Sequence, residues 1–185
     1  MSGKTIIESG MDFSGHPPED FWYIEKSNCY RKKGVQIAEF ILIIHQQNRE
    51  PFVCAVEAKT GSPRPENKTD FDEFIGKVCA KLTNAMMLVV AACLGRHPNC
   101  ASELPSSFKA LDLAKADFRL ILVLKGDPNP WPEAWLPDIK DALASKFKPL
   151  VNTWQLSPMA VQVLNEPLAK AHGLILDNLK DITPF

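Results

Sequence analysis

Phe52–Lys59 (FVCAVEAK) and the preceding Val35–Ile44 (VQIAEFILII) decide the fold. Both runs are nearly all apolar and rich in β-branched residues, which predicts two strands that are covered on both faces. Only the short polar segment Gln46–Pro51 separates them. We therefore expect the two strands to be neighbours in one sheet, joined as a hairpin.

The segments before and after this pair predict the remaining elements. The first fifteen residues are polar and are expected to be loose or partly helical, and Phe21–Ser27 has the composition of a strand. Apolar side chains recur at spacings of three and four from Phe71 to Cys93, which predicts a long helix. Later strands are expected at 118–124 and 159–164, and later helices at 133–147 and 167–172.

The two ends of the long helix have their own signals. Thr69 with Asp72 matches a capping box at the start, and Gly95 followed by Pro98 is typical of a helix end. The whole order, three strands, a helix, a strand, a helix, a strand and a helix, predicts an α/β domain. We expect a central mixed β-sheet flanked by helices, with a hairpin first and helical crossovers afterwards.

Composition and charge restrict the class of protein. The chain has 185 residues, of which 45% are hydrophobic and 23% charged, so one globular domain over residues 1–185 is expected. The formal net charge of -1 argues against a protein that coats nucleic acid nonspecifically, although it allows a local basic groove. The most apolar run, Ala85–Leu94, is shorter than the roughly 20 residues of a membrane span. We expect a soluble cytoplasmic protein.

The five cysteines are odd in number and form no CxxC pair, and three lie in apolar runs, where free cysteine behaves as a small hydrophobe; this usage fits a reducing cytoplasm. A zinc site built from Cys93, His97 and Cys100 is a weak alternative, since it offers three ligands at an unusual spacing.

Charged residues inside the two apolar strands are the main functional signal. Side chains alternate between the faces of a strand, so Glu39 lies in a row with isoleucines, and Glu57 and Lys59 share one face. A carboxylate in an apolar row is costly unless it is paired or bound to a metal. If the strands are neighbours, Glu39 and Glu57 lie near the same level of the sheet. Glu57-Ala58-Lys59 is an acid-x-lysine triplet. Two other such triplets, Glu66–Lys68 and Asp138–Lys140, lie in polar surroundings and are interpreted as solvated surface.

This set of groups suits one kind of chemistry. Two carboxylates and a backbone carbonyl are ligands for a hard cation such as Mg²⁺ or Mn²⁺, which lowers the pKa of its bound water. A neighbouring lysine adds positive charge where a transition state builds negative charge. The alternative is a buried ion pair or triad of Glu39, Glu57 and Lys59 without a metal.

The pattern AEF (38–40), CAVEAKTGSP (54–63), a long amphipathic helix and FRLILVL (118–124) resembles the PD-(D/E)xK superfamily of restriction-endonuclease-like nucleases. The resemblance covers residues 20–125 and implies a mixed-sheet core in the order α-β-β-β-α-β, with 126–185 as a C-terminal α/β elaboration. The first acid here is a glutamate without a preceding proline, which departs from the usual motif.

The resemblance also implies roles for individual residues. The catalytic positions of the family correspond to Glu39, Glu57 and Lys59. Its metal ligands correspond to Glu39, Glu57 and the Ala58 carbonyl. Glu25 is a further candidate ligand, with Asp20 behind it. Thr60, Ser62 and Arg64 are candidate contacts to substrate.

The expected function is a Mg²⁺- or Mn²⁺-dependent nuclease, a hydrolase that cleaves phosphodiester bonds, with DNA as the expected substrate. A homodimer or a larger multi-protein system is expected, since one site cuts one strand. The alternative function is a catalytically inactive nuclease-like fold that binds nucleic acid or another protein.

Overall fold

The central feature of the fold is one five-stranded mixed sheet. The computed structural model describes residues 5–30, 35–47, 49–126 and 135–176. Within these residues the strand order across the sheet is β3-β4-β5-β6-β7. The strands are β3 (Phe21–Trp22), β4 (Phe40–Gln46), β5 (Arg49–Lys59), β6 (Asp117–Leu124) and β7 (Val161–Asn165).

The sheet changes from antiparallel to parallel pairing at β5. β3 and β4 pair antiparallel, as do β4 and β5, whereas β5 with β6 and β6 with β7 are parallel. Each parallel step is made through a helix, as parallel connections require. The expected α/β class, the mixed sheet and the hairpin between the two deciding strands are therefore confirmed.

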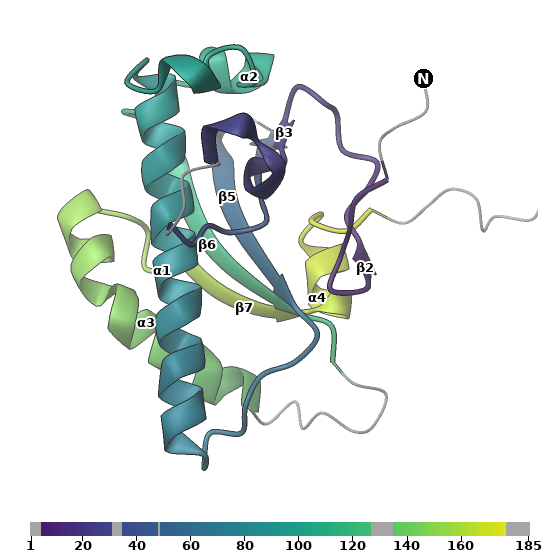
Figure 1. Ribbon diagram of the computed structural model, residues 1–185, viewed down its shortest axis with the longest axis vertical. Coiled ribbons are helices and arrows are strands. Elements are labelled where there is room, and N and C mark those ends of the chain that lie inside the picture. The colour runs from purple at the N-terminus through teal and green to yellow at the C-terminus, as the bar shows by residue number, and fades with distance from the viewer. Residues whose placement is uncertain (1–4, 31–34, 48, 127–134, 177–185) are drawn as a thin grey trace, which may run out of the picture.

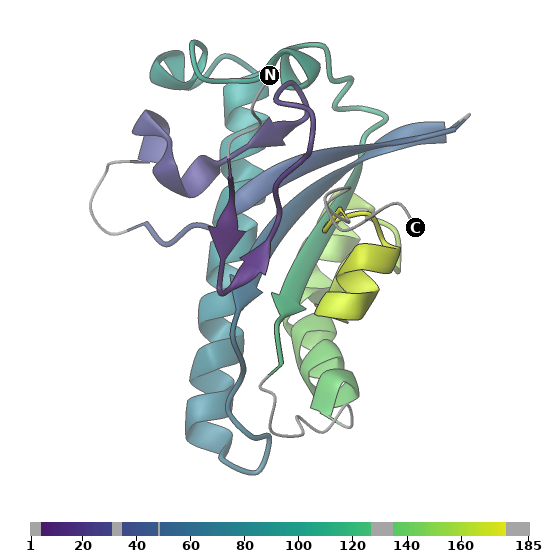
Figure 2. The ribbon, with the colours of Figure 1, turned by 90° about the vertical axis from the view of Figure 1, so that its right-hand side faces the viewer.

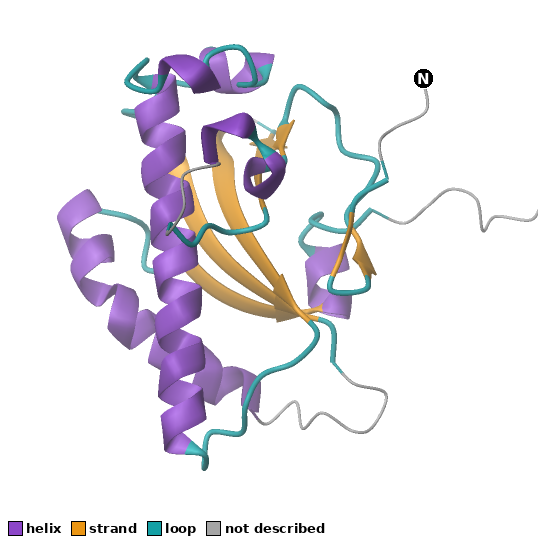
Figure 3. Ribbon diagram, viewed as in Figure 1, coloured by secondary structure: helices purple, strands orange, loops and turns teal. Residues whose placement is uncertain are grey.

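Helices cover both faces of this sheet (Figures 1 and 3). On one face lie α1 (Lys68–Cys93) and α3 (Trp135–Trp154), and on the other lies α4 (Glu166–Ala171). The N-terminal hairpin, β1 (Ile7–Glu8) and β2 (Met11–Asp12), shares the face of α4 (Figure 2). The short elements are η1 (Ile24–Lys26), η2 (Asn28–Tyr30), η3 (Pro98–Cys100) and α2 (Ser106–Lys109).

α1 is held to the sheet by the apolar stripe that the sequence predicts. Eight of its side chains are buried, from Phe71 to Ala92. Its start differs from the prediction, because Asn67 is the N-cap and no side chain caps the helix, so Thr69 and Asp72 form no capping box. By length and composition alone, α1 is long and apolar enough to cross a membrane. The core helix of a soluble protein meets the same criterion.

The N-terminal segment is a hairpin, where loose or partly helical structure was expected. Ser9 (φ 50°) and Gly10 (φ 74°) form its turn, and positive φ at both central residues is typical of a two-residue type I′ turn. A Cβ atom at Gly10 would lie 2.5 Å from the Nζ atom of Lys125, so glycine also allows a close approach there.

The predicted strand bounds were wrong in the first three strands of the sheet, and β5 begins at Arg49, three residues before the expected start. β4 begins at Phe40, five residues after the expected start, although Ile37 and Ala38 are buried. The expected strand 21–27 ends at Trp22, because the chain turns into η1, where the Glu25 N–H donates to the Glu39 carbonyl. The later elements are close to their expected positions, with α3 extended to Trp154.

Two of the five cysteines form a disulfide, which the reducing compartment expected from the sequence does not predict. A disulfide joins Cys29 to Cys100 and so connects η2 with η3, while Cys54, Cys79 and Cys93 are free. The weak zinc alternative is therefore wrong in this structure, since Cys100 is bonded and the Cys93 thiol donates to the Phe108 carbonyl.

Two adjacent methionines on α1 give a matched test of how this helix packs on the sheet. Met86 is 1% exposed and Met87 is 50% exposed. We expect Met86→Ala to lower the free energy of unfolding by about 2–5 kcal/mol, because it leaves a cavity under the helix. Met87→Ala should lower it by less than about 1 kcal/mol. Urea unfolding of both variants measures this, and equal losses would contradict the helix orientation.

Candidate functional site

The predicted residues Glu39 and Glu57 lie side by side at the end of the β4–β5 hairpin. Phe40 pairs with Val56, and the Glu39 N–H donates to the Val56 carbonyl at 3.1 Å, which continues the ladder by one step. Glu57 and Lys59 alternate with Val53 and Ala55 on the face that α1 covers. The expectation that the two carboxylates occupy the same level of the sheet is confirmed.

Glu57 is the most deeply placed charge of the site. Its side chain is fully buried, and its Oε1 atom forms an ion pair with Lys59 Nζ at 2.6 Å and accepts a hydrogen bond from Lys81 Nζ at 2.8 Å. The other oxygen, Oε2, is buried without a hydrogen-bond partner among the residues that the structure describes. A buried carboxylate with one unsatisfied oxygen has unused capacity to bind a cation or a donor.

Both lysines also contact Glu39. Its Oε1 atom lies 3.7 Å from Lys59 Nζ and 3.8 Å from Lys81 Nζ. The two ammonium groups thus lie between the two carboxylates and reduce their mutual repulsion. Burial by itself lowers the pKa of Lys81, but the hydrogen bond to Glu57 and the surrounding carboxylates outweigh it and raise that pKa. Lys81 is therefore a firmly held cation.

Lys81 was missed as a site residue, because its charge suggested solvated surface. It lies on α1 between Val78 and Ala85, at helical spacings of three and four, and both neighbours are buried. A lysine within a buried apolar stripe needs a partner, and this is the signal that could have identified it.

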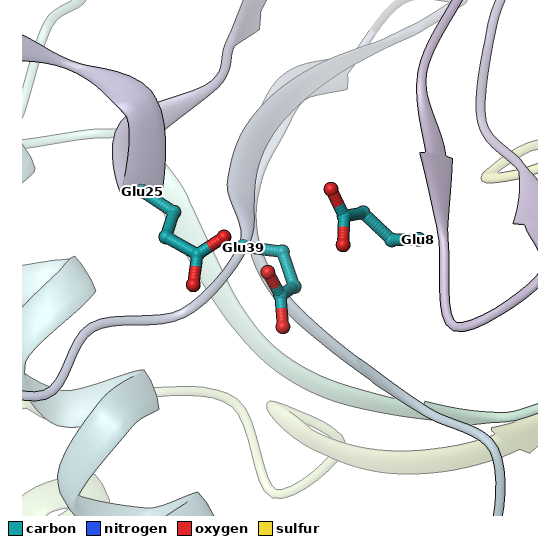
Figure 4. A group of neighbouring side chains, drawn as sticks. All are labelled: Glu8, Glu25 and Glu39. Atoms are coloured by element: carbon teal, nitrogen blue, oxygen red, sulfur yellow. The ribbon is translucent and has the colours of Figure 1, made fainter.

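Two further carboxylates approach Glu39 from other elements (Figure 4). Glu25 comes from η1 and Glu8 from β1, and ligand oxygens of Glu8, Glu25 and Glu39 all lie within 4.8 Å of one another. Glu25 was predicted as a candidate ligand, and the structure brings it to Glu39. Glu8 was missed, because the segment containing it gave no strand signal.

Burial, reinforced by neighbouring carboxylates, changes the protonation of Glu39. Burial raises its pKa to about 8, and a side-chain hydrogen bond with Glu25 and the charges of Glu57 and Glu25 act in the same direction. Burial also raises the pKa of Glu8, against the attraction of Lys26, whose Nζ lies 3.8 Å from its carboxylate. Burial and the neighbouring carboxylates together keep Glu39 protonated near neutral pH.

The charged side chains of the cluster carry more negative than positive charge. Four glutamates, at positions 8, 25, 39 and 57, carry four negative charges when ionised, and Lys59 and Lys81 supply two positive charges. The more exposed Lys26 at the rim supplies one more. Without Lys26, two negative charges remain, which a divalent cation would balance without a proton on Glu39; with Lys26, one remains.

The Ala58 carbonyl, a predicted ligand, already has a partner. It accepts a hydrogen bond from the Ser9 hydroxyl at 2.9 Å, so the turn of the β1–β2 hairpin closes onto the end of β5. A carbonyl oxygen has two lone pairs and is able to keep this bond while it binds a cation.

The remaining candidates lie around the site or apart from it. Thr60, Ser62 and Arg64 follow β5; the Ser62 hydroxyl donates to the neighbouring Pro63 carbonyl, and the Arg64 guanidinium lies over the Trp135 ring at 5.6 Å. Asp20, the acid predicted behind Glu25, instead pairs with His45 at 2.9 Å.

Comparison of the chain with models of protein families, with curated proteins and with solved structures found no match.

The raised pKa of Glu39 gives a prediction for stability without divalent cations. The folded protein retains a proton that the unfolded chain releases near pH 4.5, so this group lowers stability as the pH rises from about 4.5 to about 8. We expect Glu39→Gln to remove this contribution, so that the variant gains stability relative to wild type from pH 5 towards pH 8.

Urea unfolding in EDTA at several pH values measures the effect. Glu73→Gln on the exposed face of α1 is the control and should keep the wild-type pH dependence. A Glu39→Gln profile parallel to wild type would contradict the assigned protonation.

Proposed function

We propose that this protein is a metal-dependent phosphodiesterase, and more specifically a nuclease of the PD-(D/E)xK type that acts on DNA. The observation that carries the proposal is the buried Glu57 carboxylate, held by Lys59 and Lys81 beside Glu39. One acid directly before β4, a second acid on the adjacent β5 and a lysine two residues after the second acid make the arrangement that this chemistry needs.

The residues present fit a hard divalent cation. All the side-chain donors are carboxylate oxygens, which Mg²⁺ and Mn²⁺ prefer. Glu39 and Glu57, with the Ala58 carbonyl, would hold the ion, and Glu25 and Glu8 would complete its surroundings from the opposite side. The unpartnered Oε2 atom of Glu57 supports this assignment, because a ligand there would satisfy a buried oxygen.

When bound, such an ion makes a coordinated water a better nucleophile and polarises a phosphate oxygen. The residues of the chain supply the rest. Lys59 places a positive charge next to the carboxylates, where it stabilises the negative charge that builds up on the phosphate. Lys81 fixes the position of the Glu57 carboxylate, which in turn orients Lys59.

The order of elements supports a restriction-endonuclease-like core. The β-β-β-α-β part of the expected order corresponds to β3, β4, β5, α1 and β6. A C-terminal elaboration follows as β7 and α4. In the described residues before β3 the chain forms the β1–β2 hairpin, where that core begins with a helix. Since one site cuts one strand, double-strand cleavage would require a homodimer or a larger assembly.

One observation favours the alternative of a noncatalytic nuclease-like module that binds nucleic acid or protein. Lys59 and Lys81 already pair with both carboxylates, and such a cluster is also a structural ion network. The two functions differ in one property, since a module of this kind needs no divalent cation.

Lysine variants test catalysis. We expect Lys59→Met to lower Mg²⁺- or Mn²⁺-dependent cleavage by about 10²–10³-fold, because it removes the charge nearest the reacting phosphate. Lys77→Met on the exposed face of α1 should retain wild-type activity. The measurement is the cleavage rate on linear, circular and single-stranded DNA, with folding checked by circular dichroism. Unchanged metal-dependent cleavage by Lys59→Met would refute the mechanism.

Metal binding is tested separately. We expect Mn²⁺ to bind the wild-type protein and to raise its melting temperature, because it binds only the folded state. Glu8→Gln should weaken binding about tenfold with little effect on the fold, since Glu8 lies at the rim of the cluster. Isothermal titration with Mn²⁺ gives both affinities, and Glu50→Gln, at an exposed position of β5, is the control. A folded wild-type protein that binds no Mn²⁺ would favour the noncatalytic module.

A further inference from the structure

A second group of polar side chains surrounds a cavity on the opposite face of the sheet. The cavity has a volume of about 260 Å³ and lies between the strands and the end of α4. Arg119 and Gln162 line it from β6 and β7, and His172 and Leu174 line it from the segment that ends α4. Arg119 pairs with Cys54, five residues before Lys59 on β5, or roughly 17 Å along the strand. The cavity is thus separate from the site at Glu57.

Arg119 is an unusual residue for this position. It is 9% exposed, in a strand whose other side chains are mostly apolar. Its guanidinium lies over the Phe52 ring at 4.3 Å, and its Nη2 atom donates to Asp117 at 2.7 Å. Its Nε–H is buried without a hydrogen-bond partner among the described residues. A buried guanidinium has five donors, and this one retains unused donor capacity.

The chemistry of the lining identifies a class of ligand. Phe52, Ile121 and Leu174 provide apolar lining, and Arg119, Gln162 and His172 provide polar lining. A few polar groups converging in an apolar pocket are typical of small-molecule sites. A carboxylate matches the planar fork of arginine and brings one charge. A phosphate dianion would bring twice the charge of a carboxylate to an arginine that is already paired with Asp117.

We propose that this cavity binds a small carboxylic acid with a short apolar body, held through its carboxylate by Arg119. The inference does not depend on the proposed nuclease function. Burial raises the pKa of the Cys54 thiol in the wall to about 12, so this group is a neutral part of the lining. Asp117 and the ligand compete for the same guanidinium, so Asp117 sets the affinity.

Benzoate is a suitable probe for the full-length protein. Benzamide has nearly the same shape without the charge, and inorganic phosphate tests the other class of anion. In ¹⁵N NMR titrations we expect benzoate to shift the Arg119 Nε–H signal and the Gln162 amide signal in a saturable manner. Neither benzamide nor phosphate should do so.

Two variants make the assignment specific. Arg119→Lys should weaken benzoate binding at least tenfold, because a lysine lacks the planar fork. Asp117→Asn, at a partly exposed strand start, should strengthen it severalfold, since it removes the internal competitor. If Arg119→Lys fails to fold, the gain in benzoate affinity expected for Asp117→Asn tests the proposal by itself. Equal shifts with benzamide or phosphate, no saturation with benzoate, or no gain in Asp117→Asn would overturn the proposal.

Discussion

The burial of one carboxylate, Glu57, constrains the middle of this structure. A fully buried negative charge near the end of the middle strand destabilises the fold unless cations reach it. Lys59 reaches it from its own strand and Lys81 from α1. The second contact fixes how α1 is rotated over the sheet, because another rotation would separate Lys81 from Glu57. The same ion cluster therefore sets the packing of the helix and assembles the candidate site.

Groups from both layers that cover the sheet meet at this point. Lys81 belongs to the helical layer of α1, whereas Glu8 and Ser9 belong to the hairpin on the other face. They meet because the site lies where β5 ends, and side chains from both faces are able to reach around a strand end. The cavity at Arg119 lies within one layer and near the beginning of the parallel strands, so it has a different set of neighbours.

The sequence predicted what strand alternation and apolar runs determine. The adjacency of β4 and β5, the long helix and the shared face of Glu57 and Lys59 all follow from local patterns. Lys81 was not predicted, because its role depends on which turn of α1 lies over Glu57, and that is a matter of tertiary packing. Glu8 was missed for a different reason. Strands of two residues have no periodicity, and only the Ser9–Gly10 turn indicated the hairpin.

The bond from the Ser9 hydroxyl to the Ala58 carbonyl has a consequence for the newly synthesised chain. Its two partners are separated by 49 positions, and Lys81 follows later still. Contacts between such distant segments form only after the entropy of closing the intervening loop has been overcome. During translation the acidic residues emerge from the ribosome before the helix that neutralises them. The nascent chain therefore holds an incomplete cluster until α1 has been made and has packed against β5.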